Sequence, residues 1–157
     1  MVPFSLDIYI LSSAFDVQMS ASTIFNIVKE AASSALFPVQ QIKEKLIESD
    51  VVHFDETGLS VDKKTKWVHS SSTPALTYLT VNEKRSTVGM DAHGVLPYFR
   101  GIAIHDFWMS YLKYDNVAHG MCGAHLLREL RGVTENHPKD EWASDLAGLL
   151  VQMKNLK

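Results

Sequence analysis

Apolar residues in the first third of the chain recur at steps of three and four, which is the spacing of an amphipathic helix. A first helix is predicted from Ser20, behind a cluster of Ser and Thr residues, and Pro38 is expected to end it. A second amphipathic helix is predicted from Val39 to about Ser49. We assign these helices to a helical N-terminal segment over residues 1–49.

From Val51 onward, short β-branched and aromatic runs are separated by turn residues, which is typical of strands. The predicted order is three strands forming a meander over 51–60, 66–70 and 76–81, a weak helix over 86–93, a fourth strand over 102–105, a short aromatic helix to about Lys113, and a fifth strand over 116–121.

This order, β-β-β-α-β-α-β, is that of the ribonuclease H-like fold, in which the first and fourth strands are neighbours. We therefore predict an α/β (α+β) chain whose ribonuclease H-like core, with a mixed five-stranded sheet, covers residues 50–123. A C-terminal helical segment is predicted over 124–157, as the start of an insertion. Its last helix should begin near Lys139, with a buried stripe formed by Trp142, Leu146, Leu149, Leu150 and Met153.

Two aspartates stand in matching positions at predicted strand ends. Asp55 follows an apolar run and precedes a glycine-containing turn, and Asp106 directly follows the predicted fourth strand. Acidic oxygens at neighbouring strand ends are typical ligands of hard divalent cations such as Mg²⁺. Asp55 by itself is equally well explained as a turn or capping residue. The presence of Asp106 in the same setting favours a metal site that the two aspartates share.

Residues beside these aspartates are assigned supporting roles. Glu56 should leave the opposite face of the strand from Asp55, so we do not expect it to bind the same metal. His53 and His105 are more commonly packed or surface histidines, because Mg²⁺ prefers oxygen ligands. Four large aromatic residues are expected to pack around the sheet rather than to stack on bases: Trp67, Tyr78, Phe107 and Trp108.

Composition sets limits on this interpretation. With 157 residues and 46% hydrophobic residues, the chain is long enough for one domain with a proper core. Its net charge of -3 is not that of a typical nucleic-acid binder, so a DNA function depends on motifs. The single cysteine, Cys122, excludes an internal disulfide and suits a reducing compartment. No run is long enough to span a membrane, and we expect a cytoplasmic protein.

Several short motifs occur in order along the chain: Asp55-Glu56-Thr57-Gly58, Trp67-Val68-His69, Leu76-Thr77-Tyr78, Lys84-Arg85, the stretch from Gly101 to Tyr111, and the stretch from His119 to Leu130. In this combination, the chain resembles the transposases of the insertion-sequence 66 family, members of the DDE superfamily. The resemblance extends from about Ser20 to about Met153.

The resemblance implies metal-dependent DNA strand cleavage and strand transfer in transposition. Asp55 and Asp106 match the first and second catalytic aspartates, which in such enzymes bind two Mg²⁺ (or Mn²⁺) ions. The implied partners are DNA, as transposon ends and target, and a second copy of the chain or a full-length transposase. The implied location is the bacterial cytoplasm, at the nucleoid. A non-catalytic transposase remnant and another ribonuclease H-like nuclease remain as alternatives.

The third acid of such a site lies, in this family, beyond a helical insertion. Glu141 follows Asp106 with 34 residues between them, a gap found in some DDE enzymes, but its surroundings match the helical segment that precedes the family's glutamate. Glu141 is therefore the weaker candidate for a third ligand. We expect a transposase truncated at both ends, which lacks the third acid and is inactive on its own.

The segment after the fifth strand carries further polar residues. Cys122 and His125 have the spacing of a zinc ligand pair and His119 is nearby, but a structural zinc site normally needs four protein ligands. The resemblance implies instead that Cys122 and His125 brace the core near the site or contact DNA. Arg128 and Arg131 fall on one side of the following helix, where they either meet phosphates or form ordinary surface ion pairs.

Overall fold

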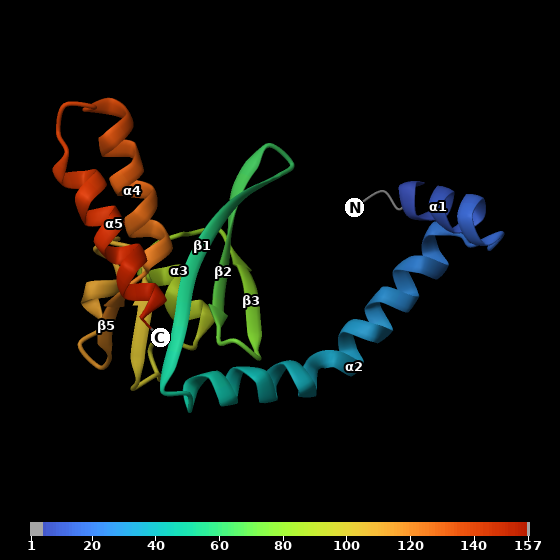
Figure 1. Ribbon diagram of the computed structural model, residues 1–157. Coiled ribbons are helices and arrows are strands. Elements are labelled where there is room, and N and C mark those ends of the chain that lie inside the picture. Colours follow the sequence, from blue (N-terminus) through green and yellow to red (C-terminus); the bar gives the residue numbers. More distant parts are fainter. Residues whose placement is uncertain (1–4, 157) are drawn as a thin grey trace. The chain divides into compact units, whose positions relative to one another are not determined.

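Two helices form the N-terminal part of the chain in the computed structural model, which describes residues 5–156 (Figure 1). Helix α1 spans Ser5–Phe15 and helix α2 spans Ala21–Ile47. Ser20 caps α2, as its Oγ accepts a hydrogen bond from the Thr23 backbone nitrogen at 3.1 Å. The chain divides after Gln41 into two compact units, so α2 begins in the first and ends in the second.

The predicted helix end at Pro38 is wrong, because α2 continues to Ile47. Proline removes one backbone hydrogen bond, to the carbonyl of Ser34, while the neighbouring turns keep theirs. Both residues are exposed, so water can satisfy the carbonyl that proline leaves unpaired. Helix α1 has no counterpart among the predicted elements, since its apolar residues do not line a single face.

A five-stranded sheet with the order β3-β2-β1-β4-β5 forms the centre of the second unit. Its strands are β1 (Val51–Val61), β2 (Lys64–Ser72), β3 (Thr77–Asn82), β4 (Ile102–His105) and β5 (Ala118–Met121). The first three form an antiparallel meander, while β4 pairs with β1, and β5 with β4, in parallel. This is the ribonuclease H-like arrangement, so the predicted fold class is confirmed.

The helices of this unit follow the predicted order with shifted ends. Helix α3 (Thr87–His93) closes at Gly94, whose φ of 73° is the left-handed conformation that suits glycine at a helix end. The predicted aromatic helix is reduced to one 3₁₀ turn, η1 (Tyr111–Lys113). Helices α4 (Gly123–Asn136) and α5 (Trp142–Asn155) lie antiparallel and side by side (Figure 1).

Alternation along β1 separates a buried face of the sheet from an open one. Val52, Phe54 and Glu56 are buried, whereas His53, Asp55 and Thr57 between them are exposed. On the buried face, Phe54 packs against two aromatic rings, with centroid distances of 5.8 Å to Phe99 and 6.4 Å to Tyr111. The core around them also includes Leu46, Met90, Val95, Leu96, Ala103 and Tyr114.

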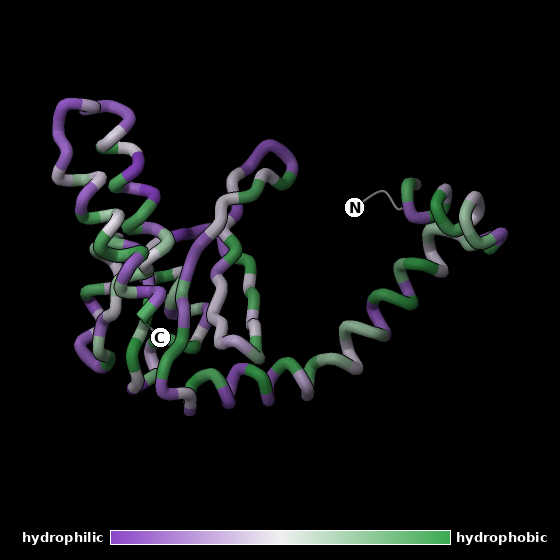
Figure 2. The backbone as a smooth tube through the Cα atoms, viewed as in Figure 1, coloured by the Kyte–Doolittle hydropathy of each residue, from purple (hydrophilic) through white to green (hydrophobic). Residues whose placement is uncertain are grey.

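The predicted buried stripe of the last helix is wrong. Trp142, Leu149 and Met153 are more than half exposed, and the buried residue of α5 is Ala143. Helix α5 packs mainly against α4, so much of its remaining surface meets solvent. Figure 2 shows the hydrophilic turn of the α4–α5 hairpin and hydrophobic positions along α5. No helix within residues 5–156 is both long and apolar enough to cross a bilayer.

Candidate active site

Asp55 and Asp106 lie at corresponding points of two neighbouring parallel strands. The register of β1 and β4 places His53 opposite Ile104, and two further residues along each strand lead to Asp55 and Asp106. Because alternate residues of a strand share a face, Asp55 lies on the open face with His53, while Asp106 directly follows the buried His105 and is partly exposed. Asp55 lies in the middle of β1 rather than at its end, because β1 continues to Val61 in its pairing with β2, so the predicted strand end and glycine-containing turn are wrong. The register of β1 with β4 nevertheless places Asp55 at the level of Asp106, which directly follows β4.

Both carboxylate oxygens of Asp106 accept hydrogen bonds. Oδ1 accepts from the backbone nitrogen of Trp108 at 2.9 Å, and Oδ2 accepts from Nη2 of Arg85 at 3.2 Å. Each oxygen has two lone pairs, so each keeps one for a further partner. The orientation of Asp106 is thus held by the protein itself.

Asp55 is more open, with 49% of its side chain exposed. Its Oδ1 accepts a hydrogen bond from the Glu56 backbone nitrogen at 2.8 Å and lies 4.0 Å from Nε2 of His125. His125 comes from the first turn of α4, so this helix begins over the open face of the sheet. Among residues 5–156, Nδ1 of His125 is the one buried side-chain polar atom without a hydrogen-bond partner.

Arg85 links Asp106 to the buried face of the sheet. Arg85 bonds to Asp106, and its Nε also lies 3.4 Å from Oε2 of Glu56. The guanidinium carbon of Arg85 lies over two indole rings, 4.1 Å from the ring centroid of Trp108 and 5.2 Å from that of Trp67. Stacking on two indoles fixes the plane of the guanidinium. The sequence marks Arg85 only as part of a motif, because its partners are 21 and 29 residues away.

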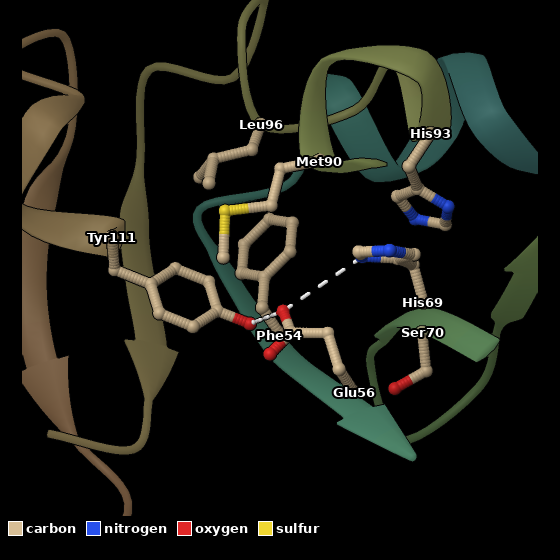
Figure 3. Close-up of a pocket in the computed structure, with 8 residues that line it drawn as sticks. All are labelled: Phe54, Glu56, His69, Ser70, Met90, His93, Leu96 and Tyr111. Atoms are coloured by element: carbon tan, nitrogen blue, oxygen red, sulfur yellow. Dashed lines mark hydrogen bonds and ion pairs between the residues drawn. The ribbon is translucent and has the colours of Figure 1, made fainter. Parts of the chain in front are cut away.

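Glu56 lies beneath this arrangement, on the face opposite Asp55, as strand alternation predicts. Tyr111 Oη donates a hydrogen bond to Oε1 of Glu56, and Nδ1 of His69 is 3.9 Å from the same oxygen (Figure 3). Burial raises the pKa of Glu56, although the Tyr111 bond and the Arg85 charge oppose this. Burial lowers the pKa of His69, so at neutral pH the imidazole is uncharged and forms no ion pair.

The cavity that Figure 3 shows beside Glu56 does not have room for a substrate. It encloses about 10 Å³ between the sheet, α3 and Tyr111, which is about the space that one water molecule requires. This cavity is therefore a small packing gap beneath the two aspartates and not a binding site.

A larger cleft of about 450 Å³ opens beside Asp106. It is lined by Arg85, Asp106, Phe107, Trp108, His125, Leu126 and Glu129. The predicted packing role is confirmed for Tyr78 and Trp108, which pack against the core. It is wrong for Phe107, whose side chain is 49% exposed. Phe107 lies two residues beyond the end of β4, in the lining of this cleft.

The two histidines that precede the aspartates differ in burial. His53 is exposed on the open face, two residues before Asp55. His105 is buried, stacks on Tyr111 at 4.2 Å, and its Nε2 is 2.8 Å from Nδ1 of His119. Burial lowers the pKa of His105, which is therefore neutral at physiological pH. His119 thus pairs with His105 between neighbouring strands.

The remaining candidates lie at the start of α4 or along it. Cys122 precedes α4, and its backbone nitrogen donates to the His105 carbonyl at 2.8 Å, which ties the helix start to β4. Arg128 and Arg131 are exposed along α4, and Arg131 lines a separate groove between α4 and α5.

Glu141 stands at the far end of the helical hairpin from His125. It is exposed and directly precedes α5, so most of α4 separates it from the sheet. The eleven residue steps from His125 to the end of α4 correspond to roughly 16 Å at 1.5 Å per residue. The fold does not bring Glu141 to Asp55 and Asp106.

Within residues 5–156, no group of three or more His, Cys, Asp and Glu side chains is arranged to hold a metal ion. The two aspartates nevertheless present carboxylate oxygens with free lone pairs, and oxygen is the donor that Mg²⁺ takes. The donor chemistry of the pair therefore fits Mg²⁺ or Mn²⁺.

Comparisons with known proteins give one family and several solved structures. A family model described as "Transposase IS66 family" matches residues 3–157. A search of curated proteins found no match. The HTLV-2 integrase catalytic core domain in complex with magnesium, in its trimeric form, is similar with a TM-score of 0.39 and 13% identity, over 62% of this chain and 80% of that chain. The dimeric form of the same domain has a TM-score of 0.38 and 12% identity, over 62% of this chain and 81% of that chain. The simian T-cell lymphotropic virus intasome in complex with PP2A regulatory subunit B56 gamma has a TM-score of 0.37 and 10% identity, over 64% of this chain and 46% of that chain.

Proposed function

Because the chain belongs to the IS66 family of transposases, we propose that Asp55 and Asp106 carry metal-dependent DNA strand cleavage and strand transfer. The observation that supports this assignment is the parallel register of β1 and β4, which leads from the paired residues His53 and Ile104 to Asp55 and Asp106 at the same level of the sheet.

If Asp55 and Asp106 held a Mg²⁺ pair, it would supply activation of a water or 3′-hydroxyl and stabilisation of the leaving oxygen in an in-line displacement. The protein's part is to hold the ligands in place. Asp106 is already oriented by Arg85 and by the Trp108 backbone nitrogen. Among residues 5–156, Asp55 Oδ1 accepts one hydrogen bond, from the Glu56 backbone nitrogen, and lies 4.0 Å from Nε2 of His125, while about half of the side chain stays open to solvent.

Glu141 is not part of this proposal, because α4 separates it from both aspartates. Among the described residues, two carboxylates are too few to fix two cations, and positioning supplies much of the rate in phosphoryl transfer. We therefore expect this chain by itself to bind Mn²⁺ weakly and to show no strand cleavage. If the chain cleaved DNA and Glu141→Ala abolished that cleavage, the expectation that the chain is inactive would be refuted.

Titration with Mn²⁺, followed by its electron paramagnetic resonance signal, tests the metal ligands directly. Asp55→Asn and Asp106→Asn should each weaken Mn²⁺ binding by about 10-fold or more, as even supporting residues of metal sites commonly contribute that much. Asp62→Asn is the matched control, since Asp62 is an exposed carboxylate at the β1–β2 turn with a φ of 50° that asparagine also adopts. Equal binding by all three variants would refute the assignment.

A further inference from the structure

Phe107 presents an open aromatic surface directly beside Asp106. Its side chain is 49% exposed, and no aromatic ring of the described residues packs against it. It lines the cleft of about 450 Å³ that also contains Arg85, Trp108 and Glu129. Pockets of about 300–1,000 Å³ are typical of small-ligand sites, so the cleft can receive a group larger than a water or an ion.

The charges of this cleft do not favour a phosphate as its occupant. Among residues 5–156, Arg85 is the one Lys or Arg side chain that lines it, and its guanidinium is already paired with Glu56 and Asp106. Glu129 adds a further carboxylate. A phosphate would meet two carboxylates and a guanidinium that has its partners. A neutral, flat group with amino substituents would instead meet an apolar ring and a hydrogen-bond acceptor.

We propose that this cleft receives a single unpaired base of a DNA strand, stacked on the ring of Phe107. The identity of the strand as DNA rests on the proposed function. Every base has a π face, and stacking on an aromatic side chain contributes about 1–3 kcal/mol per base. A base must leave its own stack to enter, which costs a few kcal/mol in a duplex and less in a single strand.

Fluorescence anisotropy with a labelled 12-nucleotide oligo(dC) in EDTA tests the proposal without any metal. Phe107→Ala should weaken binding by about 5- to 150-fold, which is the fold-change for one lost stacking contact. Phe107→Trp should retain binding, because the indole also offers a flat surface. Met109→Ala is the matched control, as Met109 is an exposed apolar residue two positions further along the same loop, and it should leave binding unchanged.

An oligomer of the same length made of abasic sugar phosphates separates the base from the backbone. It should bind more weakly than oligo(dC), and its binding should not depend on Phe107. Equal affinity of the two oligomers, or equal affinity of wild type and Phe107→Ala for oligo(dC), would overturn the proposal. The Mn²⁺ titration of Asp55→Asn and Asp106→Asn tests the metal ligands separately. If the base-binding proposal is refuted, the result for the metal ligands therefore still stands.

Discussion

Replacing Arg85 by alanine is expected to destabilise the fold by exposing the energetic cost of burying Glu56. The guanidinium lies 3.4 Å from Glu56 and 3.2 Å from Asp106, and only 2% of the Glu56 side chain is exposed. Removing one partner of a fully buried ion pair costs about 3–5 kcal/mol. Arg85 is 33% exposed and Tyr111 remains as a donor to Glu56, so water and the hydroxyl recover part of this cost.

We therefore expect Arg85→Ala to lower the free energy of unfolding by about 2–3 kcal/mol, including the lost stacking on Trp67 and Trp108. Urea denaturation followed by tryptophan fluorescence measures this directly. Lys84→Ala is the matched control, because the neighbouring Lys84 side chain is exposed and should change stability by no more than about 0.5 kcal/mol.

A double-mutant cycle with Glu56→Gln shows whether charge is the cause. In the Gln background the buried group is neutral, so removing Arg85 should cost only about 1 kcal/mol, from lost stacking and the lost bond to Asp106. An equal loss in both backgrounds would refute the reasoning, because the destabilisation would then come from packing alone.

Two further predictions concern the layer beneath the site. Burial lowers the pKa of His93 from 6.5 to about 4, so the unfolded chain takes up a proton that the folded chain does not, and stability falls as pH drops through 6.5. Urea denaturation at pH 7 and pH 5 measures this loss. Because burial also lowers the pKa values of His69 and His105, part of the loss remains in His93→Gln, and the wild type should lose about 2 kcal/mol more than the variant; an equal loss in both would contradict the prediction. Tyr111→Phe removes a hydrogen bond to the Glu56 carboxylate and should cost about 1.5–3 kcal/mol in the same denaturation assay, whereas a loss below about 0.5 kcal/mol would mean that water replaces the hydroxyl.

Local pattern was sufficient for the strands and for the faces on which their side chains lie. The alternation of Val52 and Phe54 with His53 and Asp55 already separates a core face from an open face, because the side-chain period of a strand is two. The order of the elements then allowed few topologies, and the observed sheet is the one expected. Asp55 and Asp106 could be singled out for the same reason, since each directly follows a recognisable apolar run.

The sequence pattern predicted the ends of the helices and their buried faces less well than it predicted the strands. The pattern of α5 shows which residues are apolar, but burial depends on how many neighbours the helix has, and α4 is the neighbour that covers Ala143. At Pro38, the missing hydrogen bond is a local penalty, and a helix of 27 residues continues past it.

Only the tertiary structure decided the surroundings of Asp106. Arg85 follows β3 and reaches both Glu56 on β1 and the residue after β4, so its two partners meet only when the sheet has formed. The open cleft and the exposed ring of Phe107 depend equally on where α4 begins over the sheet. Periodicity describes which face of its own element a residue occupies, whereas pairing and exposure depend on elements that are distant in sequence and meet by folding.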